Sequence, residues 1–303
     1  MKYSYTGFLM AFILPALLFT SCRKEDLLIV DDISGLGGDT WTTTAIDTWL
    51  YDSLTVPYNI ATKYKWNQSE LAYDKTIVPP DEEKIIPVMR TIKKVWIDSY
   101  VAEGGYLFFK KYCPKFFVLA GSASWNLDGS ITLGTAEGGR KVVIYLLNEF
   151  KNKSMAGYKA SDSAIAKQMF HVIEHEFTHI LDQTIRRPVE FDAVCAGFYT
   201  SDWINTFDAE ARKDGFITAY ALSKPVEDWA EMVSIMLIEG RAGFNAIVNS
   251  ISESSVRGTT ADEAKAKLRL KESLVVNYFK QAWNIDFYSL QSRTRQAIVK
   301  ELY

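Results

Sequence analysis

Three histidines, His171, His175 and His179, are the only ones in the chain, and they recur every four residues. Four residues span slightly more than one helical turn, so in a helix the three imidazoles would lie on one face. His175 and His179, with Glu176 directly after the first, form the pattern His-Glu-x-x-His. Two imidazoles with this spacing can share one tetrahedral Zn²⁺. We therefore expect His175 and His179 to be metal ligands.

Glu176 lies about 100° around the same helix from His175, so it would border the metal and not bind it. A carboxylate in that place can take a proton from a water molecule activated by the metal. We therefore predict that Glu176 is catalytic. The alternative is a pair of histidines in a helix that binds no metal. Apolar neighbours such as Phe170, Ile173 and Phe177 indicate that this helix packs against a core.

A third ligand must come from another part of the chain. The metzincin extension of the motif needs a Gly and a His where this chain has Asp182 and Ile185, so that class is excluded. His171 lies one turn before His175, and it would contact the groups that hydrogen-bond to the metal ligands and not the metal itself. We favour an ordinary surface or core role for His171. The third ligand should then be a carboxylate.

The best source of that carboxylate is a predicted helix that follows Pro225, in which Glu227 lies 48 residues beyond His179. Glu227 and Glu231 are one turn apart in it and face the same way. One can bind the metal while the other accepts the N–H of a ligating histidine. We assign Glu227 as the ligand and Glu231 as the partner of the histidine. The reversed assignment stays open, as does an acidic first helical turn with no metal.

Tyr220 precedes Glu227 by seven residues. Its phenol could donate a hydrogen bond to the oxyanion that forms during attack on a carbonyl, so we consider it a second catalytic residue. A buried structural tyrosine is the equal alternative.

The N-terminus has the features of an export signal. Lys2 precedes an apolar run, Gly7–Phe19, of the length expected for a signal peptide. Thr20-Ser21-Cys22 then resembles the lipobox of bacterial lipoproteins, which predicts lipidation of Cys22; an ordinary secretory leader is the alternative. The charged residues Arg23–Asp26 resemble a surface-export signal of Bacteroidetes lipoproteins, although a solvated tether explains them too. We divide the chain into a leader (1–21), a tether (22–43) and one domain (44–303).

The domain is predicted to be α+β, with a small antiparallel-rich sheet packed on a central His-Glu-x-x-His helix and a mainly helical C-terminal part. Gly134–Lys141 has glycines but lacks the Gly-Lys-Ser/Thr ending of a phosphate loop, and we interpret it as a hairpin turn. Cys113 and Cys195 are as compatible with two buried thiols as with a disulfide. The expected elements are helices over 44–54, 81–104 and 261–283, and strands over 56–66, 116–120, 130–135 and 141–147.

Composition excludes some classes of function. The chain has 34 Lys and Arg against 37 Asp and Glu, a net charge of −3, which argues against a nucleic-acid binder. No apolar run after the leader approaches the roughly 18 residues of a membrane span.

With these motifs the chain resembles a gluzincin, and the spacing of Tyr220, Glu227, Ala230 and Glu231 resembles that of the lethal-factor-like zinc peptidases. It resembles more closely the Bacteroidetes substrate import-associated zinc metallohydrolase lipoproteins. The segments that carry this resemblance are Pro57–Ile60, Val95–Ile97, Gly134–Lys141, His175–Gln183 and Glu227–Met232. The resemblance implies a zincin-like fold, a link to a TonB-dependent SusC/SusD-type uptake system, and a substrate-binding strand over 141–147.

Two functions follow as expectations. The first is a zinc-dependent peptidase that a lipid anchor holds in the outer membrane and that cleaves a peptide or protein substrate. The second is a zinc-containing lipoprotein without catalysis that binds a ligand or partner for an outer-membrane transporter. Glu176 discriminates between them, because a pure binder has no need of a general base beside the two histidines.

Overall fold

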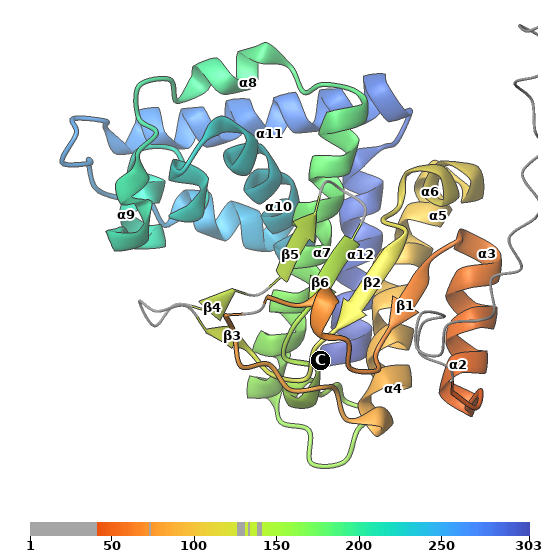
Figure 1. The fold of residues 1–303 in the computed structure, drawn as a ribbon. Helices are drawn as coiled ribbons and strands as arrows, with labels where there is room; N and C mark the ends of the chain where they lie inside the picture. The colour runs from red at the N-terminus through yellow and green to blue at the C-terminus, as the bar shows by residue number, and fades with distance from the viewer. Residues whose placement is uncertain (1–40, 73, 126–130, 133, 138–140) are drawn as a thin grey trace, which may run out of the picture. The chain divides into compact units, whose positions relative to one another are not determined.

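The computed structural model describes residues 41–72, 74–125, 131–132, 134–137 and 141–303 (Figure 1). The compact unit within it is Thr44–Tyr303. The predicted leader, Cys22 and residues 23–40 of the predicted tether lie outside the described residues. Among the helices that are described, none combines the length and the apolar character needed to cross a membrane.

Helices make up most of the unit, and a small sheet lies against them. The helices are α2 (Ala45–Leu50), α3 (Val56–Tyr58), α4 (Glu82–Ile92), α5 (Asp98–Gly104), α6 (Tyr106–Tyr112), α7 (Ser163–Thr184), α8 (Val189–Val194), α9 (Asp208–Lys213), α10 (Pro225–Asn249), α11 (Ala261–Trp283) and α12 (Phe287–Leu302). The strands are β1 (Ala61–Lys63), β2 (Phe116–Leu119), β3 (Ser124–Trp125), β4 (Ile131–Thr132), β5 (Gly134–Glu137) and β6 (Lys141–Ile144).

Four of the strands form one sheet in the order β1-β2-β6-β5. β1, β2 and β6 are parallel, and β5 alone is antiparallel to its neighbour β6. The predicted antiparallel-rich sheet is therefore wrong in strand direction, although the α+β class is correct. The error has a physical reason: strands β1 and β2 are joined by the helices α4 to α6, and such a crossover returns the chain parallel to itself.

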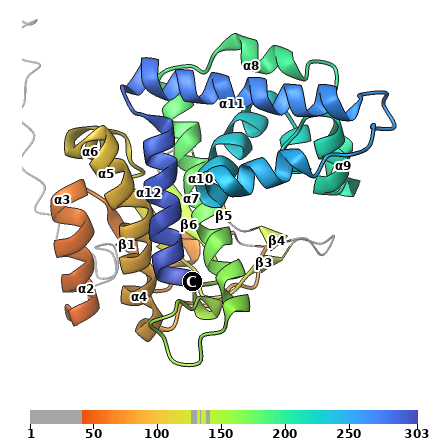
Figure 2. The same ribbon diagram turned by 180° about the vertical axis from the view of Figure 1, so that it is seen from behind.

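The two faces of the sheet are buried against different parts of the chain. Phe117, Leu119, Val142 and Ile144 point into the main core, which the helices complete. The alternate residues of β2 and β6 point the other way, where Ile77 and the segment after β1 cover them. Seen from behind, α4, α12 and α7 lie together on the helical face (Figure 2).

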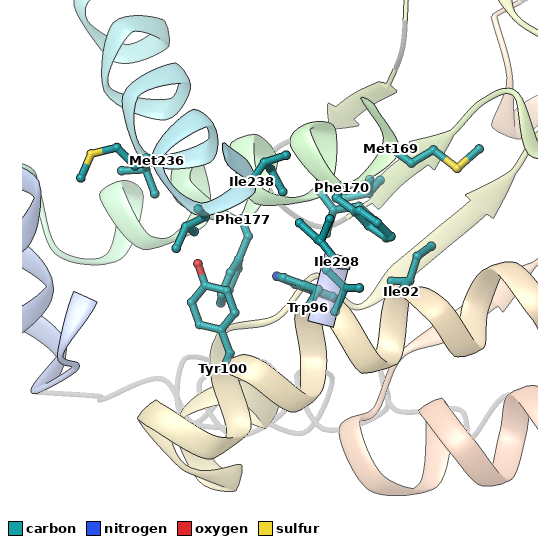
Figure 3. Packing of buried hydrophobic residues seen from close by; sticks show 14 of the residues in the cluster. Ile92, Trp96, Tyr100, Met169, Phe170, Phe177, Met236, Ile238 and Ile298 are labelled. Atoms are coloured by element: carbon teal, nitrogen blue, oxygen red, sulfur yellow. The ribbon is translucent and has the colours of Figure 1, made fainter. Parts of the chain in front are cut away.

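Aromatic side chains fill the main core beneath α7. The Trp96 and Phe177 rings meet edge to face with centroids 5.4 Å apart, and Tyr100 meets Phe177 in the same way at 4.9 Å. Figure 3 shows Trp96 and Tyr100 directed at Phe177, with Phe170 and Ile298 beside them. Each such aromatic pair adds about 0.5–1.5 kcal/mol beyond the burial of its surface. The packing fixes the position of the helix that carries the three histidines.

Several predicted elements are confirmed. The helix predicted to begin at Asp81 and end at Gly104 is α4 and α5, joined by a π-helical turn, with Pro87 inside α4. α11 has the predicted bounds and begins with a capping box between Thr260 and Glu263. The predicted hairpin is β5 and β6, although its turn (138–140) lies outside the described residues.

Other predictions need correction. The strand predicted over 56–66 is a helical turn, Val56–Tyr58, followed by the short strand β1. The alternating apolar residues misled the prediction, because Asn59 adopts a left-handed conformation that ends the helical turn before β1 begins. β6 lies between β2 and β5, so the predicted substrate-binding edge is wrong as well, and β5 forms that edge of the sheet. Cys113 and Cys195 are both free and buried.

Candidate metal centre

Helix α7 presents two different faces. Phe170, Ile173 and Phe177 are buried in the aromatic core, and His175 and His179 lie roughly half a turn away from them. The first turns of α10 pack along this second face. Pro225 occupies the first turn of α10, where its fixed backbone angle favours helix initiation and its missing N–H has no cost. The two helices thus bring residues far apart in the sequence to one place.

Three side-chain atoms converge between the helices. Oε2 of Glu227 lies 2.9 Å from Nε2 of His175 and 3.1 Å from Nε2 of His179. The two Nε2 atoms are 3.0 Å from each other. His175 and Glu227 are buried, and His179 is half-buried. The predicted trio of His175, His179 and Glu227 is therefore brought together by the fold.

These separations suit a zinc ion. At zinc–ligand bond lengths of ~2.0–2.1 Å, the ligand atoms of a tetrahedral site stand about 3.3 Å apart. The three observed separations are a few tenths of an ångström shorter, so the same rotamers can open slightly around an ion. Two imidazoles and one carboxylate form a donor set typical of catalytic zinc sites, which keep a fourth position open.

Glu231 lies behind the first histidine. Its Oε1 is 2.7 Å from Nδ1 of His175 and 3.0 Å from Nε2 of His171, and its Oε2 accepts a hydrogen bond of 2.7 Å from the hydroxyl of Thr218. When Nε2 of His175 faces a metal, Nδ1 carries the proton and donates to Glu231. The carboxylate thus fixes both the tautomer and the orientation of the ring.

His171, His175 and Glu231 form a second group of potential ligands, which shares His175 with the first. The second group is enclosed, because the Glu231 side chain is only 4% exposed. The Glu231 carboxylate is at hydrogen-bond distance from two imidazoles and accepts a hydrogen bond from a hydroxyl. In the first group, by contrast, Oε2 of Glu227 meets Nε2 of both histidines of the His-Glu-x-x-His pattern. We therefore assign the metal centre to the first group.

The charges of the two glutamates and His175 support one another. Burial acts to raise the pKa of Glu227 and of Glu231, but the histidines at hydrogen-bond distance outweigh it and hold both pKa values well below the ordinary range. Burial acts to lower the pKa of His175, and the same two carboxylates raise it to about 10. Both glutamates are therefore ionised at neutral pH, as a metal ligand and its hydrogen-bond partner require.

Glu176 and Tyr220 flank the three converging atoms. Burial raises the pKa of the Glu176 carboxyl, the charges of His175 and His179 lower it, and that of Glu227 raises it. The ring of Tyr220 is 5.8 Å from that of His175. Burial raises the pKa of Tyr220, and the three neighbouring glutamates raise it further, so its phenol keeps the proton that it could donate.

Several residues of the site carry no recognisable signal in the sequence. Thr218 supports Glu231, Trp203 packs edge to face on Tyr220 at 4.9 Å, and the Lys224 ammonium lies 3.2 Å from Oε1 of Glu227. None of the three belongs to a sequence motif, and only their contacts in the folded structure connect them to the site. His171, which we expected to have an ordinary role, contacts Glu231 directly.

Comparison with known families gives one match over most of the chain. Residues 39–288 match the model of a family described as "Putative zinc-binding metallo-peptidase". The chain belongs to this family. Among solved structures, the chain is similar to a protein of Bacteroides caccae described in the same words, with 32% sequence identity and a TM-score of 0.66. The alignment covers 84% of this chain and 91% of that one. No curated protein matches the chain.

The family match spans the candidate metal centre. The matched segment includes α7, α10 and every residue of the candidate metal centre. The expectation of a zinc metallopeptidase, drawn from the histidine pattern, is confirmed at the level of the family.

Proposed function

We propose that this protein is a zinc-dependent peptidase in which His175, His179 and Glu227 hold the metal. The observation that carries the proposal is the convergence of two imidazole nitrogens and one carboxylate oxygen within 3.1 Å of one another. Zinc, when bound, supplies a Lewis acid that polarises a peptide carbonyl and makes water acidic enough to be deprotonated near neutral pH.

The side chains around the metal have distinct roles in this proposal. Glu176 takes the proton of the attacking water and returns it to the leaving amine. Its raised pKa brings it nearer to the working pH of such a base. Tyr220 donates its phenolic proton in a hydrogen bond to the oxyanion. Glu231 is not a ligand in this assignment, because it holds Nδ1 of His175.

The sheet offers a place for an extended peptide. β5 ends the four-stranded sheet and runs antiparallel to β6, and it packs near α7. The backbone groups of β5 on the side away from β6 could pair with an extended peptide by strand addition. This arrangement supports a peptide or protein as the substrate.

Replacement of Glu176 by Gln tests the mechanism. The variant should bind one zinc ion with the affinity of the unchanged protein, and lose at least about 100-fold in cleavage rate. The assay is a mass-spectrometric digest of a peptide library, with and without chelator. A fully active Glu176→Gln variant would contradict the mechanism. An unchanged protein that binds zinc but cleaves nothing would instead favour the non-catalytic lipoprotein.

We further propose that the protein is an outer-membrane lipoprotein, displayed on the cell surface and linked to a SusC/SusD-type transporter. The support is the leader, the lipobox-like Cys22 and the charged Arg23–Asp26 in the sequence. Labelling with a palmitate analogue should mark the unchanged protein and not a Cys22→Ala variant. Proteolysis of intact cells that leaves the protein uncut would argue against surface display, and crosslinking that recovers no transporter would argue against the transport link.

A further inference from the structure

A fully buried ion pair lies beside the metal centre. Nζ of Lys271, in the middle of α11, is 2.6 Å from Oδ2 of Asp228, and neither side chain has any exposed surface. The same ammonium donates to the carbonyl oxygen of Gly215 at 2.8 Å. The hydroxyl of Tyr199 donates to Oδ2 of Asp228 at 3.1 Å. The ammonium also lies 4.4 Å from the centre of the Phe216 ring. A carboxylate, a carbonyl oxygen and an aromatic ring therefore surround it.

The pair is poorly explained by a gain in stability. Lysine is among the residues least often fully buried, because its charge must leave water. Burial raises the pKa of the Asp228 carboxyl, and Lys271 acts against that rise. Oδ1 of Asp228 has no hydrogen-bond partner among the described residues. Apolar side chains of similar volume often replace such pairs without loss of stability.

The contacts of Lys271 join the segments that carry the metal centre. Asp228 directly follows Glu227 in the first turn of α10, and this turn has no side-chain N-cap to fix it. Gly215 begins the short segment that leads to Thr218, the partner of Glu231, and on to Tyr220. α11 lies across the end of α10 that bears Glu227 and along α8 (Figure 1). One ammonium therefore ties both segments to the same long helix.

We propose that Lys271 is a positioning residue of the metal centre, which holds the Glu227 turn and the Tyr220 segment in register through Asp228 and Gly215. Lys271 touches neither a ligand atom nor the site of reaction, so its effect passes through these two contacts. The inference rests on the proposed metal site, and it adds a requirement that the His-Glu-x-x-His pattern does not contain.

A double variant separates positioning from stability. Lys271→Met with Asp228→Leu removes both charges and keeps the volume nearly constant, so the metal-free protein should stay folded, with at most a modest fall in unfolding temperature because the Gly215 carbonyl and the Tyr199 hydroxyl lose a partner. Its affinity for Zn²⁺ should nevertheless fall roughly ten- to hundredfold, as for loss of other outer contacts of metal sites. The visible absorption bands of the Co²⁺-loaded variant should shift, because they report the geometry of the ligands.

Gln291→Met is the matched control. The Gln291 amide donates to the carbonyl oxygen of Met236 at 2.7 Å, a buried contact that ties the same helix α10 to α12, away from Glu227. This variant should keep the Zn²⁺ affinity and the Co²⁺ spectrum. If the double variant does not fold, Tyr199→Phe decides, since it removes one contact to Asp228 and no charge; it should weaken Zn²⁺ binding at least threefold.

The possible results are distinguishable. Unchanged Zn²⁺ affinity and an unchanged Co²⁺ spectrum in the double variant would overturn the positioning role, as would an unchanged affinity in Tyr199→Phe when that variant decides. Equal weakening by Gln291→Met would overturn it too, because any loosening of α10 would then have the same effect. An unchanged protein that binds no Zn²⁺ would refute the proposed metal site itself.

Discussion

Nδ1 of His175 lies 2.7 Å from Oε1 of Glu231, so the ring that offers Nε2 to the metal-binding position is held from behind by a second carboxylate. Glu227 faces the opposite edge of the same ring at 2.9 Å. One imidazole therefore stands between two glutamates one turn apart on α10. This relationship decides which glutamate binds the metal and which one orients the ligand.

Loss of the carboxylate behind His175 should weaken metal binding without removing a ligand. Glu231→Gln keeps the shape of the side chain but removes its negative charge, which faces hydrogen-bond partners on His171, His175 and Thr218. We expect the Zn²⁺ affinity to fall roughly 10- to 100-fold, measured by competition with a chromophoric chelator. Glu272→Gln is the control, because Glu272 is a similarly buried glutamate on α11 with no contact to the site. Equal affinities of Glu231→Gln and the unchanged protein would show that the orientation of His175 needs no carboxylate.

Removal of the Tyr220 hydroxyl should affect the reaction and leave the metal in place. We expect Tyr220→Phe to lower kcat about 100- to 1,000-fold with little change in Zn²⁺ content, because the hydroxyl is an oxyanion donor and not a metal ligand. The ring and its contact with Trp203 are retained. Steady-state kinetics on a cleaved peptide measures kcat and KM separately. A change confined to KM would assign the tyrosine to substrate binding.

Zinc binding should release protons. In the metal-free protein the pKa of His175 is raised to about 10, above its ordinary value of 6.5, so the ring is protonated at pH 7. A metal at Nε2 must displace that proton, and the apparent Zn²⁺ affinity should rise about tenfold per pH unit between pH 7 and 9. Calorimetry in buffers of different ionisation enthalpy counts the protons. Binding that releases none at pH 7 would contradict the raised pKa.

The same shift has a consequence for the metal-free fold. A folded-state pKa above the unfolded one means that protonated His175 stabilises the fold fully below pH 6.5, and that this contribution is lost as the pH rises through 10. Glu227 and Glu231 have lowered pKa values, so their contribution is present above their ordinary value of 4.5 and is lost only in strong acid. These groups together favour the metal-free fold most between pH 4.5 and 6.5.

Glu174 should make the stability depend on pH independently of the metal. Burial raises its pKa from 4.5 to about 8, although the Tyr100 hydroxyl that donates to it acts in the other direction. The contribution of protonated Glu174 to the free energy of unfolding is therefore fully present below pH 4.5 and is lost as the pH rises through 8. Glu174→Gln cannot ionise, so its advantage over the unchanged protein should grow by about 1.4 kcal/mol per pH unit in that window.

Urea unfolding of both proteins at pH 5 and pH 8, in the presence of a chelator, measures this advantage. His175 titrates alike in the two proteins, so its contribution cancels in the difference. A difference in unfolding free energy that stays constant from pH 5 to pH 8 would show that Glu174 is ionised throughout.

The site was more predictable from the sequence than the sheet was. His175, His179, Glu176 and the two glutamates follow from helical periodicity, because a local repeat fixes which side chains share a face. Strand direction depends on the route of the chain between strands; the continuous apolar runs of β2 and β6 fit strands buried on both faces, but such a run does not by itself fix the direction. Thr218 contacts Glu231 and Lys271 contacts Asp228 from outside α10, and no spacing rule connects either pair.

Buried ion pairs hold both ends of the segment that connects α7 to α10. Arg187 is buried just after α7, where its side chain and backbone N–H bond Asp182 and its guanidinium also bonds Asp192. At the other end, the Lys271 contact holds the start of α10. A change in the chain between these two points therefore leaves both helices in place, and it reaches the chemistry only where it alters Thr218 or Tyr220, which that chain carries to the site.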